Sequence, residues 1–247
     1  MGKMMLYYTR MFDIYTLVLD PSEDAPSRLA SNEFFQGDLM DFETVVEFGR
    51  KADVITIEIE NVNVDALEQL EKEGKVVYPQ SSVLRTIQNK AKQKLFYRDH
   101  NIPTADFSRF AYTSEIDEAV ANGGLSYPFV WKSAQFGYDG TGVKIIRRYT
   151  DLIDLPNVEC IAENLIPFKN ELAVIVARSA SGKVTTYPVV EMEFHPEANQ
   201  VEYVICPARI DSQVAIKARK VAEATSRAFE HVGLLAVEMF QTADDQI

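Results

Sequence analysis

Apolar and polar positions in the first eighty residues alternate between the spacing of helices and the spacing of strands. The strand-like runs are short and rich in β-branched residues, as buried parallel strands tend to be. Helical runs carry apolar residues three or four positions apart. Alternation at this spacing predicts a parallel α/β sheet. The predicted order is helix 3–12, strand 15–19, helix 42–51, strand 54–59, helix 64–73 and strand 76–78.

The pattern changes after Pro79, where a basic helix over 82–101 leads into a strand-rich region. Within this region a glycine at the end of the segment 179–182 predicts a hairpin turn. The mixture of helix and strands without regular alternation indicates an α+β domain. Strands are predicted at 106–111, 129–133, 143–146, 160–165, 172–178, 184–191, 201–205 and 234–241.

The clearest helix in the chain spans 214–232, where small and apolar residues recur at alternating steps of four and three. Asp211 or Ser212 would cap its start, and Gly233 would end it. No internal repeat and no low-complexity segment interrupts the pattern. The fold class is therefore α/β, with an α/β domain at residues 1–85 and an α+β domain at 86–247.

The first domain opens on a helix, whereas doubly wound domains open on a strand followed by a glycine turn. We therefore expect its first strand to be missing, and the second domain to be incomplete at its C-terminal end.

Composition narrows the function classes. The 247 residues carry a formal net charge of −12, which disfavours a nucleic-acid partner. No apolar run is long enough for a membrane span, and the start lacks a secretory cleavage site. Both cysteines, Cys160 and Cys206, lie in apolar stretches and are predicted to be buried, reduced thiols, with a disulfide or metal site as the alternative. A cytoplasmic location is expected.

The segment from Lys132 to Gly142 is the sharpest local feature, because three of the chain's 11 glycines fall within six residues between two predicted strands. Such a loop can hold phosphates through its backbone amides, or it can be a glycine-rich hairpin turn. It is not a Walker loop. Lys132 favours the phosphate interpretation, because a lysine inside an apolar strand is costly unless it meets an anion.

A basic cluster precedes this loop, with five basic residues and no acid between Arg85 and Arg98. Three of them, Lys90, Lys94 and Arg98, recur every four residues and would share one helical face. That stripe is either a solvated helix face or part of an anion site.

Acidic residues form the third group. Glu163 ends a predicted strand, Glu171 opens the next, and Glu238 lies within an apolar strand. An inward carboxylate at Glu238 would need a partner such as Mg²⁺, whereas an outward edge position would not. The three histidines lack metal-ligand spacing, and no nucleophile elbow or electropositive cysteine is present. The chemistry is therefore expected to rest on electrostatic positioning of phosphate.

Several segments together resemble the N5-carboxyaminoimidazole ribonucleotide synthase family, the ATP-dependent subunit of phosphoribosylaminoimidazole carboxylase, within the ATP-grasp enzymes. The resemblance covers essentially the whole chain, and the combination is specific although each motif alone is weak. The segments are Asp53 to Val62 (DVITIEIENV), Tyr78 to Gln80 (YPQ), Gln93 and Lys94 with Ile102 to Thr104 (IPT), and Phe136 to Gly142 (FGYDGTG).

This resemblance implies an ATP-dependent ligase of de novo purine (IMP) biosynthesis, a family also described as carboxylase or lyase. ATP would phosphorylate bicarbonate to carboxyphosphate, and the amine of aminoimidazole ribonucleotide would capture the activated carboxyl group. ATP and Mg²⁺ are the implied cofactors, and a homodimer is a family-based expectation, with no nucleic-acid or membrane partner. The domains would be a Rossmann-like pre-ATP-grasp domain and an ATP-grasp domain. We expect this chain to be inactive alone.

The resemblance also implies roles for individual residues. Lys90 and Lys132 match positions that touch ATP phosphates, Phe136–Gly142 matches the loop over them, and Glu171 matches the acid that holds the ribose hydroxyls. Tyr138 and Asp139 are the implied catalytic residues, and Glu238 is the implied magnesium ligand. The full implied nucleotide-binding set is Lys90, Lys132, Phe136, Gly137, Tyr138, Asp139, Gly140, Thr141, Gly142, Glu163, Asn164, Leu165, Ile166, Glu171 and His195.

Departures from the family pattern are few. Lys90 stands where some members have arginine, Phe136 replaces the first glycine of the loop, and an insertion after Glu191 makes the match of His195 uncertain. The opening strand is absent, as is everything after Ile247, where the family completes its magnesium and substrate sites.

Two other functions remain open. One is another ATP-grasp carboxyl-activating enzyme, such as a formate-dependent transformylase or a biotin carboxylase. The other is a nucleotide-binding module without turnover.

Overall fold

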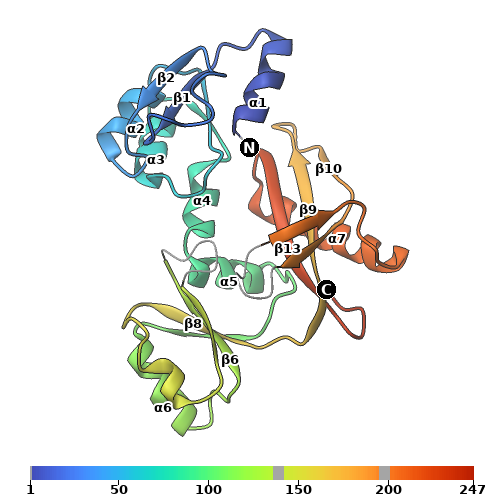
Figure 1. The fold of residues 1–247 in the computed structure, drawn as a ribbon. Coiled ribbons are helices and arrows are strands. Elements are labelled where there is room, and N and C mark those ends of the chain that lie inside the picture. The colour runs from blue at the N-terminus through green and yellow to red at the C-terminus, as the bar shows by residue number, and fades with distance from the viewer. Residues whose placement is uncertain (1, 136–141, 195–200) are drawn as a thin grey trace. The chain divides into compact units, whose positions relative to one another are not determined.

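The computed structural model describes residues 2–135, 142–194 and 201–247. The chain forms two compact units, Met1–Arg85 and Thr86–Ile247, each with its own hydrophobic core (Figure 1). Within the described ranges, no helix combines the length and the apolar character that crossing a membrane requires.

The first unit alternates helices and strands as predicted. Its elements are α1 (Gly2–Thr9), the 3₁₀ helix η1 (Arg10–Phe12), β1 (Leu17–Asp20), β2 (Glu33–Gln36), α2 (Phe42–Gly49), β3 (Val54–Thr56), α3 (Val64–Lys72), β4 (Val76–Tyr78) and α4 (Ser81–Ile87). Strand β1 pairs with β2, and β3 pairs with β4, both in parallel. The predicted parallel pairing is confirmed. The sequence pattern missed β2, because this four-residue strand has only two apolar residues, Phe34 and Phe35, side by side.

Helices α2 and α3 hold the core of the first unit. Their apolar residues, among them Val46, Leu67 and Leu70, are buried against β3 and β4. Each helix starts at a side-chain cap: Asp41 accepts a hydrogen bond from the Thr44 amide, and Asn63 accepts one from the Ala66 amide. These caps satisfy amides that would otherwise lack a partner at the helix start.

The second unit is an α+β structure built on two sheets. Its elements are α5 (Lys90–Asp99), β5 (Phe107–Phe110), η2 (Thr113–Glu115), α6 (Ile116–Ala121), β6 (Phe129–Ser133), β7 (Val143–Ile146), η3 (Tyr149–Leu152), β8 (Cys160–Asn164), β9 (Phe168–Arg178), β10 (Val184–Thr186), β11 (Val190–Phe194), β12 (Val201–Ile205), α7 (Ser212–Phe229) and β13 (Gly233–Thr242). Helix α6 was not predicted.

Two predicted elements prove to be pairs. The single helix expected over 82–101 is wrong, because the chain forms α4 and α5 with Asn89 as the N-cap of the second; its side chain accepts a hydrogen bond from the Lys92 amide. The single strand expected over 184–191 is also wrong. It divides into β10 and β11, and Pro188, which has no amide to donate, lies between them.

The end of α7 also differs from its prediction. Asp211 caps the start as predicted, by accepting a hydrogen bond from the Gln213 amide. The helix ends before Glu230, which adopts φ 51°, and Gly233 instead begins β13. Arg178 donates hydrogen bonds to the carbonyls of Glu230 and His231 at 2.9 and 3.0 Å. A side chain from β9 thus satisfies carbonyls that follow the helix.

The four-stranded sheet has the order β5-β8-β6-β7, with antiparallel neighbours. One face buries Phe129, Trp131 and Cys160 in a core that includes Ile116 of α6. The opposite face carries Ile161, which is buried with Ala91 of α5. The two faces of this sheet therefore belong to two different apolar layers.

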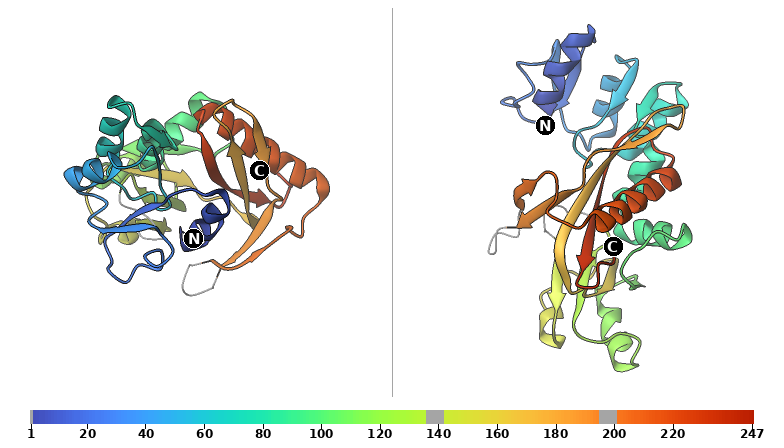
Figure 2. Two further views of the ribbon diagram at one scale, coloured as in Figure 1. Left: turned by 90° about the horizontal axis from the view of Figure 1, so that it is seen from above. Right: turned by 90° about the vertical axis from the view of Figure 1, so that its right-hand side faces the viewer.

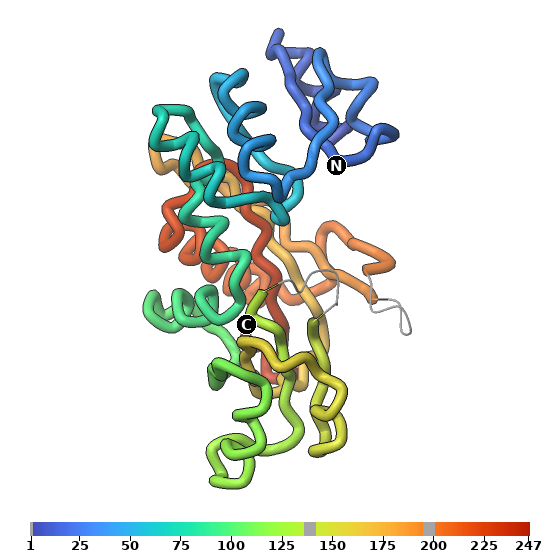
Figure 3. The backbone as a smooth tube through the Cα atoms, turned by 90° about the vertical axis from the view of Figure 1, so that its left-hand side faces the viewer, coloured from blue at the N-terminus to red at the C-terminus, as the bar shows by residue number. Residues whose placement is uncertain are grey.

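The five-stranded sheet is centred on β9, whose long edge pairs with β13 and whose other edge pairs with β10 and β11. Helix α7 covers one face, where it buries Val174 and Val237 (Figure 2). Strands β9 and β13 run side by side along nearly their whole length (Figure 3). The predicted hairpin is confirmed as the β9–β10 turn, with Gly182 at φ 83°.

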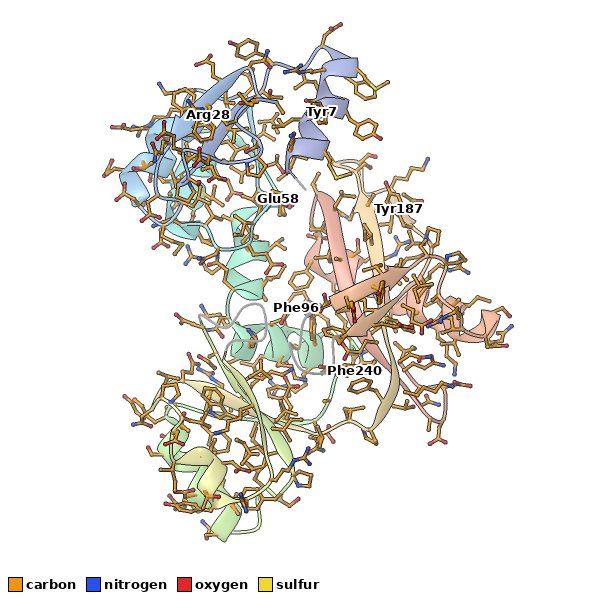
Figure 4. The ribbon with its side chains drawn as sticks, in the orientation of Figure 1. Tyr7, Arg28, Glu58, Phe96, Tyr187 and Phe240 are labelled. Atoms are coloured by element: carbon orange, nitrogen blue, oxygen red, sulfur yellow. The ribbon has the colours of Figure 1, made fainter. Side chains whose placement is uncertain are left out.

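Helices α5 and α7 meet through aromatic side chains. The rings of Phe96 and Phe229 stack with centroids 4.1 Å apart (Phe96 is labelled in Figure 4). This contact joins α5, which packs on the four-stranded sheet, to α7, which packs on the five-stranded sheet.

The two cysteines differ in environment. Cys160 is buried as predicted, and burial raises the pKa of its thiol. Cys206 is exposed, so the prediction that both are buried is wrong. It follows β12, whose residues are almost all exposed because the strand lies at the end of its sheet.

Candidate functional site

Lys132 lies on β6 and pairs with a carboxylate of the neighbouring strand. Its Nζ is 2.9 Å from Oε2 of Glu163, and its side chain is 26% exposed. In the antiparallel register Lys132 lies opposite Ile161 and Val130 lies opposite Glu163, so the lysine and the glutamate share one face two positions apart. The sequence pattern predicted that Lys132 needs an anionic partner. The carboxylate of Glu163 is such a partner within the chain.

A second lysine reaches the same carboxylate. Lys94 on α5 is only 6% exposed, and its Nζ lies 3.6 Å from Oε1 of Glu163. It also donates hydrogen bonds to Oγ1 of Thr104 at 2.6 Å and to the carbonyl of Ala105 at 2.8 Å. Burial, and to a lesser extent the charge of Lys132, lowers the pKa of Lys94. The interpretation of Lys94 as part of a solvated stripe is wrong.

Sequence reasoning did not assign Lys94 to the site, although a signal was available. Position 94 lies three residues after Ala91, which is fully buried, so the two share the helix face that packs on the sheet. The repeat of basic residues every four positions concealed this, because it includes position 94, which faces the sheet.

Lys90 is placed at the first turn of α5 and at the end of β6. Its amide donates a 2.8 Å hydrogen bond to the carbonyl of Ala134, two residues beyond Lys132. The N-terminus of a helix attracts anions because its amides and dipole are positive. The fold thus brings Lys90, Lys132 and Glu163 to one region.

The base of the glycine-rich loop lies beside this region. The Ser133 amide donates a 2.9 Å hydrogen bond to the carbonyl of Gly142, and Gly142 has φ 73°, a conformation that glycine adopts without strain. The other assigned positions of the loop, and one histidine, lie outside the described residues. They are Phe136, Gly137, Tyr138, Asp139, Gly140, Thr141 and His195.

The segment Glu163 to Ile166 connects the two sheets, because it ends β8 and leads into β9. The Asn164 amide donates a 2.9 Å hydrogen bond to the carbonyl of Asp106, which fixes the end of the strand. Leu165 and Ile166 are half-buried.

The second group of assigned acids lies on the open face of the five-stranded sheet. Glu171 of β9 pairs with Phe240 of β13, and Glu238 lies two positions away on the same face. Glu238 is exposed, so of the two alternatives left open by the sequence the outward edge position is the one observed; β13 lies at an edge of the sheet and points this residue away from α7. Burial, followed by the charge of Glu238, raises the pKa of Glu171.

The two groups have opposite electrostatic character. Two ammonium groups share the single carboxylate of Glu163, which leaves a net positive charge for an anion. Two carboxylates repel each other at Glu171 and Glu238, which a cation would relieve. Among the described residues no group of three or more metal-ligating side chains is assembled. The first group is therefore suited to an anion and the second to a cation.

Comparisons with known proteins identify the domains of the chain. Residues 95–247 match the model of the ATP-grasp domain, and residues 1–88 match that of the ribonucleotide synthetase pre-ATP-grasp domain. The chain is 32% identical, over its whole length, to a phosphoribosylaminoimidazole carboxylase of Candida glabrata, of which it spans 44%.

Two solved structures have the same fold. The ADP complex of an N5-carboxyaminoimidazole ribonucleotide synthetase is 33% identical with a TM-score of 0.90, over 99% of this chain and 65% of that one. The Aspergillus clavatus N5-carboxyaminoimidazole synthase, in complex with ADP and 5-aminoimidazole ribonucleotide, is 30% identical with a TM-score of 0.86, over 99% and 64%. The chain thus spans about two fifths to two thirds of these relatives.

The predicted fold class, a pre-ATP-grasp domain followed by an ATP-grasp domain, is confirmed by these matches. The chain belongs to the ATP-grasp family, as a member that resembles the N5-carboxyaminoimidazole ribonucleotide synthases.

Proposed function

We propose that this chain carries the nucleotide-binding and phosphate-positioning part of an ATP-dependent enzyme that carboxylates 5-aminoimidazole ribonucleotide with bicarbonate in purine biosynthesis. The observation that carries the proposal is the pairing of Lys132 and Lys94 with one carboxylate, Glu163, at the junction of the two sheets. The relatives described above support the choice of substrate class, since one was solved with ADP and 5-aminoimidazole ribonucleotide.

The phosphates would lie near Lys132 and the first turn of α5. Lys132 is partly exposed and can exchange its carboxylate partner for a phosphate oxygen, while Lys90 adds a second charge at the helix start. The glycine-rich loop joins β6 to β7 in the sequence, and we assign it to the same phosphates. These residues orient the anion and need no covalent bond to it.

The rest of the nucleotide would follow the chain from one sheet to the other. We assign the backbone of Glu163 to Ile166 to the adenine and Glu171 to the ribose hydroxyls. Glu238, exposed on the same face as Glu171, would hold Mg²⁺. Bound ATP would supply the activating phosphoryl group, and Mg²⁺ would neutralise charge on its phosphates. Tyr138 and Asp139 of the loop are proposed to contact the reacting groups.

The test is ADP release by the natural polypeptide that carries this chain, measured with bicarbonate and aminoimidazole ribonucleotide together and with each alone. We expect release only when both are present. Lys132→Ala should lower the rate of release, because the phosphates lose a charge that orients them, whereas Lys144→Ala, on the adjacent strand β7, should not.

The same assay with formate or biotin distinguishes the proposed function from the alternative functions. Release that depends on formate or on biotin would contradict the proposal in favour of another ATP-grasp enzyme. Nucleotide binding without release under any of these conditions would indicate a binding module without turnover.

A further inference from the structure

Lys94 is a buried lysine to which the proposed function assigns no contact with the nucleotide. Its ammonium group has three directions of contact, and they are filled by the Thr104 hydroxyl, the Ala105 carbonyl and the Glu163 carboxylate. It also lies 5.2 Å from the ring centre of Phe107. A lysine has three donors and no acceptor. Two of the donors of Lys94 make hydrogen bonds and the ammonium group also faces Glu163 at an ion-pair distance of 3.6 Å, so it is not presented to a ligand.

The negative charge of Glu163 indicates a role for Lys94. Glu163 is almost as buried as Lys94, at 8% exposed, and an ionised buried carboxylate needs a partner. At present it has two: Lys132 at 2.9 Å and Lys94 at 3.6 Å. If Lys132 moves to a phosphate, Lys94 remains to neutralise Glu163.

We propose that Lys94 is a positioning residue of the nucleotide site, which keeps Glu163 paired so that Lys132 is released to bind phosphate. The inference rests on the proposed function, since it requires Lys132 to meet a phosphate. Without Lys94, Glu163 would depend on Lys132 alone. Binding of phosphate would then strand a buried carboxylate, and the nucleotide would bind more weakly.

A purely structural role is the competing explanation. Lys94 also connects α5 to the segment just before β5, through its hydrogen bonds to Thr104 and Ala105. If that were its whole role, its loss would weaken the fold, and the charge at Glu163 would be irrelevant. The two explanations therefore differ in whether a change at Glu163 can compensate for a change at Lys94.

The experiment measures ADP affinity by calorimetry on the 247-residue chain and its variants. Lys94→Met, which keeps the length of the side chain, should weaken ADP binding about tenfold, the scale of one charge-assisted hydrogen bond. Adding Glu163→Gln should restore most of the affinity, because a neutral amide no longer holds Lys132. Lys92→Met, on an exposed position of the same helix, is the matched control and should bind as the wild type does.

The outcomes are separable. Unchanged affinity in Lys94→Met, or no recovery in the double variant, overturns the inference and leaves the proposed function in place if Lys132→Ala still loses affinity. A wild-type chain that does not bind ADP overturns both. If Lys94→Met does not fold in thermal melts, Glu163→Gln alone decides: affinity tighter than the wild type supports the inference, because the amide no longer holds Lys132, and equal or weaker affinity overturns it.

Discussion

At the level of single residues, the charged side chains of the site share a small number of partners. Glu163 serves two lysines from two different elements, one on β6 and one on α5. The sequence identified Lys132 from a simple rule, that a lysine in an apolar strand needs an anion. The same rule could not say that the anion is Glu163, because the partners are 31 positions apart and only the antiparallel register brings them together.

His231 is predicted to make the stability of the protein depend on pH. Its side chain is fully buried, and burial lowers its pKa below 6.5, with a further contribution from Arg178. Below pH 6.5 the unfolded chain therefore binds a proton that the folded chain does not. The free energy of unfolding should fall by up to about 1.4 kcal/mol for each pH unit until the depressed pKa is reached.

The measurement is chemical denaturation at pH 7.5 and pH 5.5. The loss of stability between these values should be smaller in His231→Phe than in the wild type. His100→Gln, which changes an exposed histidine, should keep the full loss. An equal loss in the wild type and His231→Phe would show that His231 is protonated in the folded state.

At the scale of elements, the break between α4 and α5 decides where the site begins. One continuous, basic helix over 82–101 was predicted from the sequence pattern. Asn89 interrupts that helix: it is 5% exposed, and its side chain accepts a hydrogen bond from the Lys92 amide. A new helix N-terminus is thereby created at Lys90, beside the carbonyl of Ala134.

Asn89→Ala should lower stability and nucleotide affinity together. Loss of an N-cap costs about 0.5–2 kcal/mol, and fraying of the first turn would displace Lys90. Denaturation and ADP titration on the same samples would measure both effects.

Asn63→Ala is the matched control. It removes the same kind of cap from α3 in the other unit, so it should lower stability but leave ADP affinity unchanged. ADP affinity that stays at the wild-type value in Asn89→Ala would contradict a role for the α5 start in binding.

At the scale of the whole molecule, sequence pattern predicted the architecture well and the site in part. Parallel pairing in the first unit, the long helix α7 and most strands follow from periodicity, because burial dictates it. Pro188 divides a predicted strand and Asn89 divides a predicted helix. Periodicity missed both divisions, because it is a property of a whole segment and each division depends on a single residue. The exposure of Glu238 could not be decided from the sequence, because it depends on which face of β13 is covered by α7. The burial of Lys94 was missed, because the repeat of basic residues concealed the inward face that Lys94 shares with Ala91.

The assigned residues that the structure describes, from Lys90 to Glu238, all belong to the second unit. We propose that this unit forms an adenine-nucleotide site in which Lys132 binds phosphate. Calorimetric titration of ADP into the 247-residue chain, Lys132→Ala and Lys144→Ala tests it most directly. Lys144 is the matched control, since it lies opposite Trp131 on β7 and donates to the Asp151 carbonyl.

The wild type and Lys144→Ala should bind ADP equally. Lys132→Ala should bind it roughly tenfold to a hundredfold more weakly, as expected for a lost charge-assisted hydrogen bond. Equal affinity in all three proteins would contradict the claim.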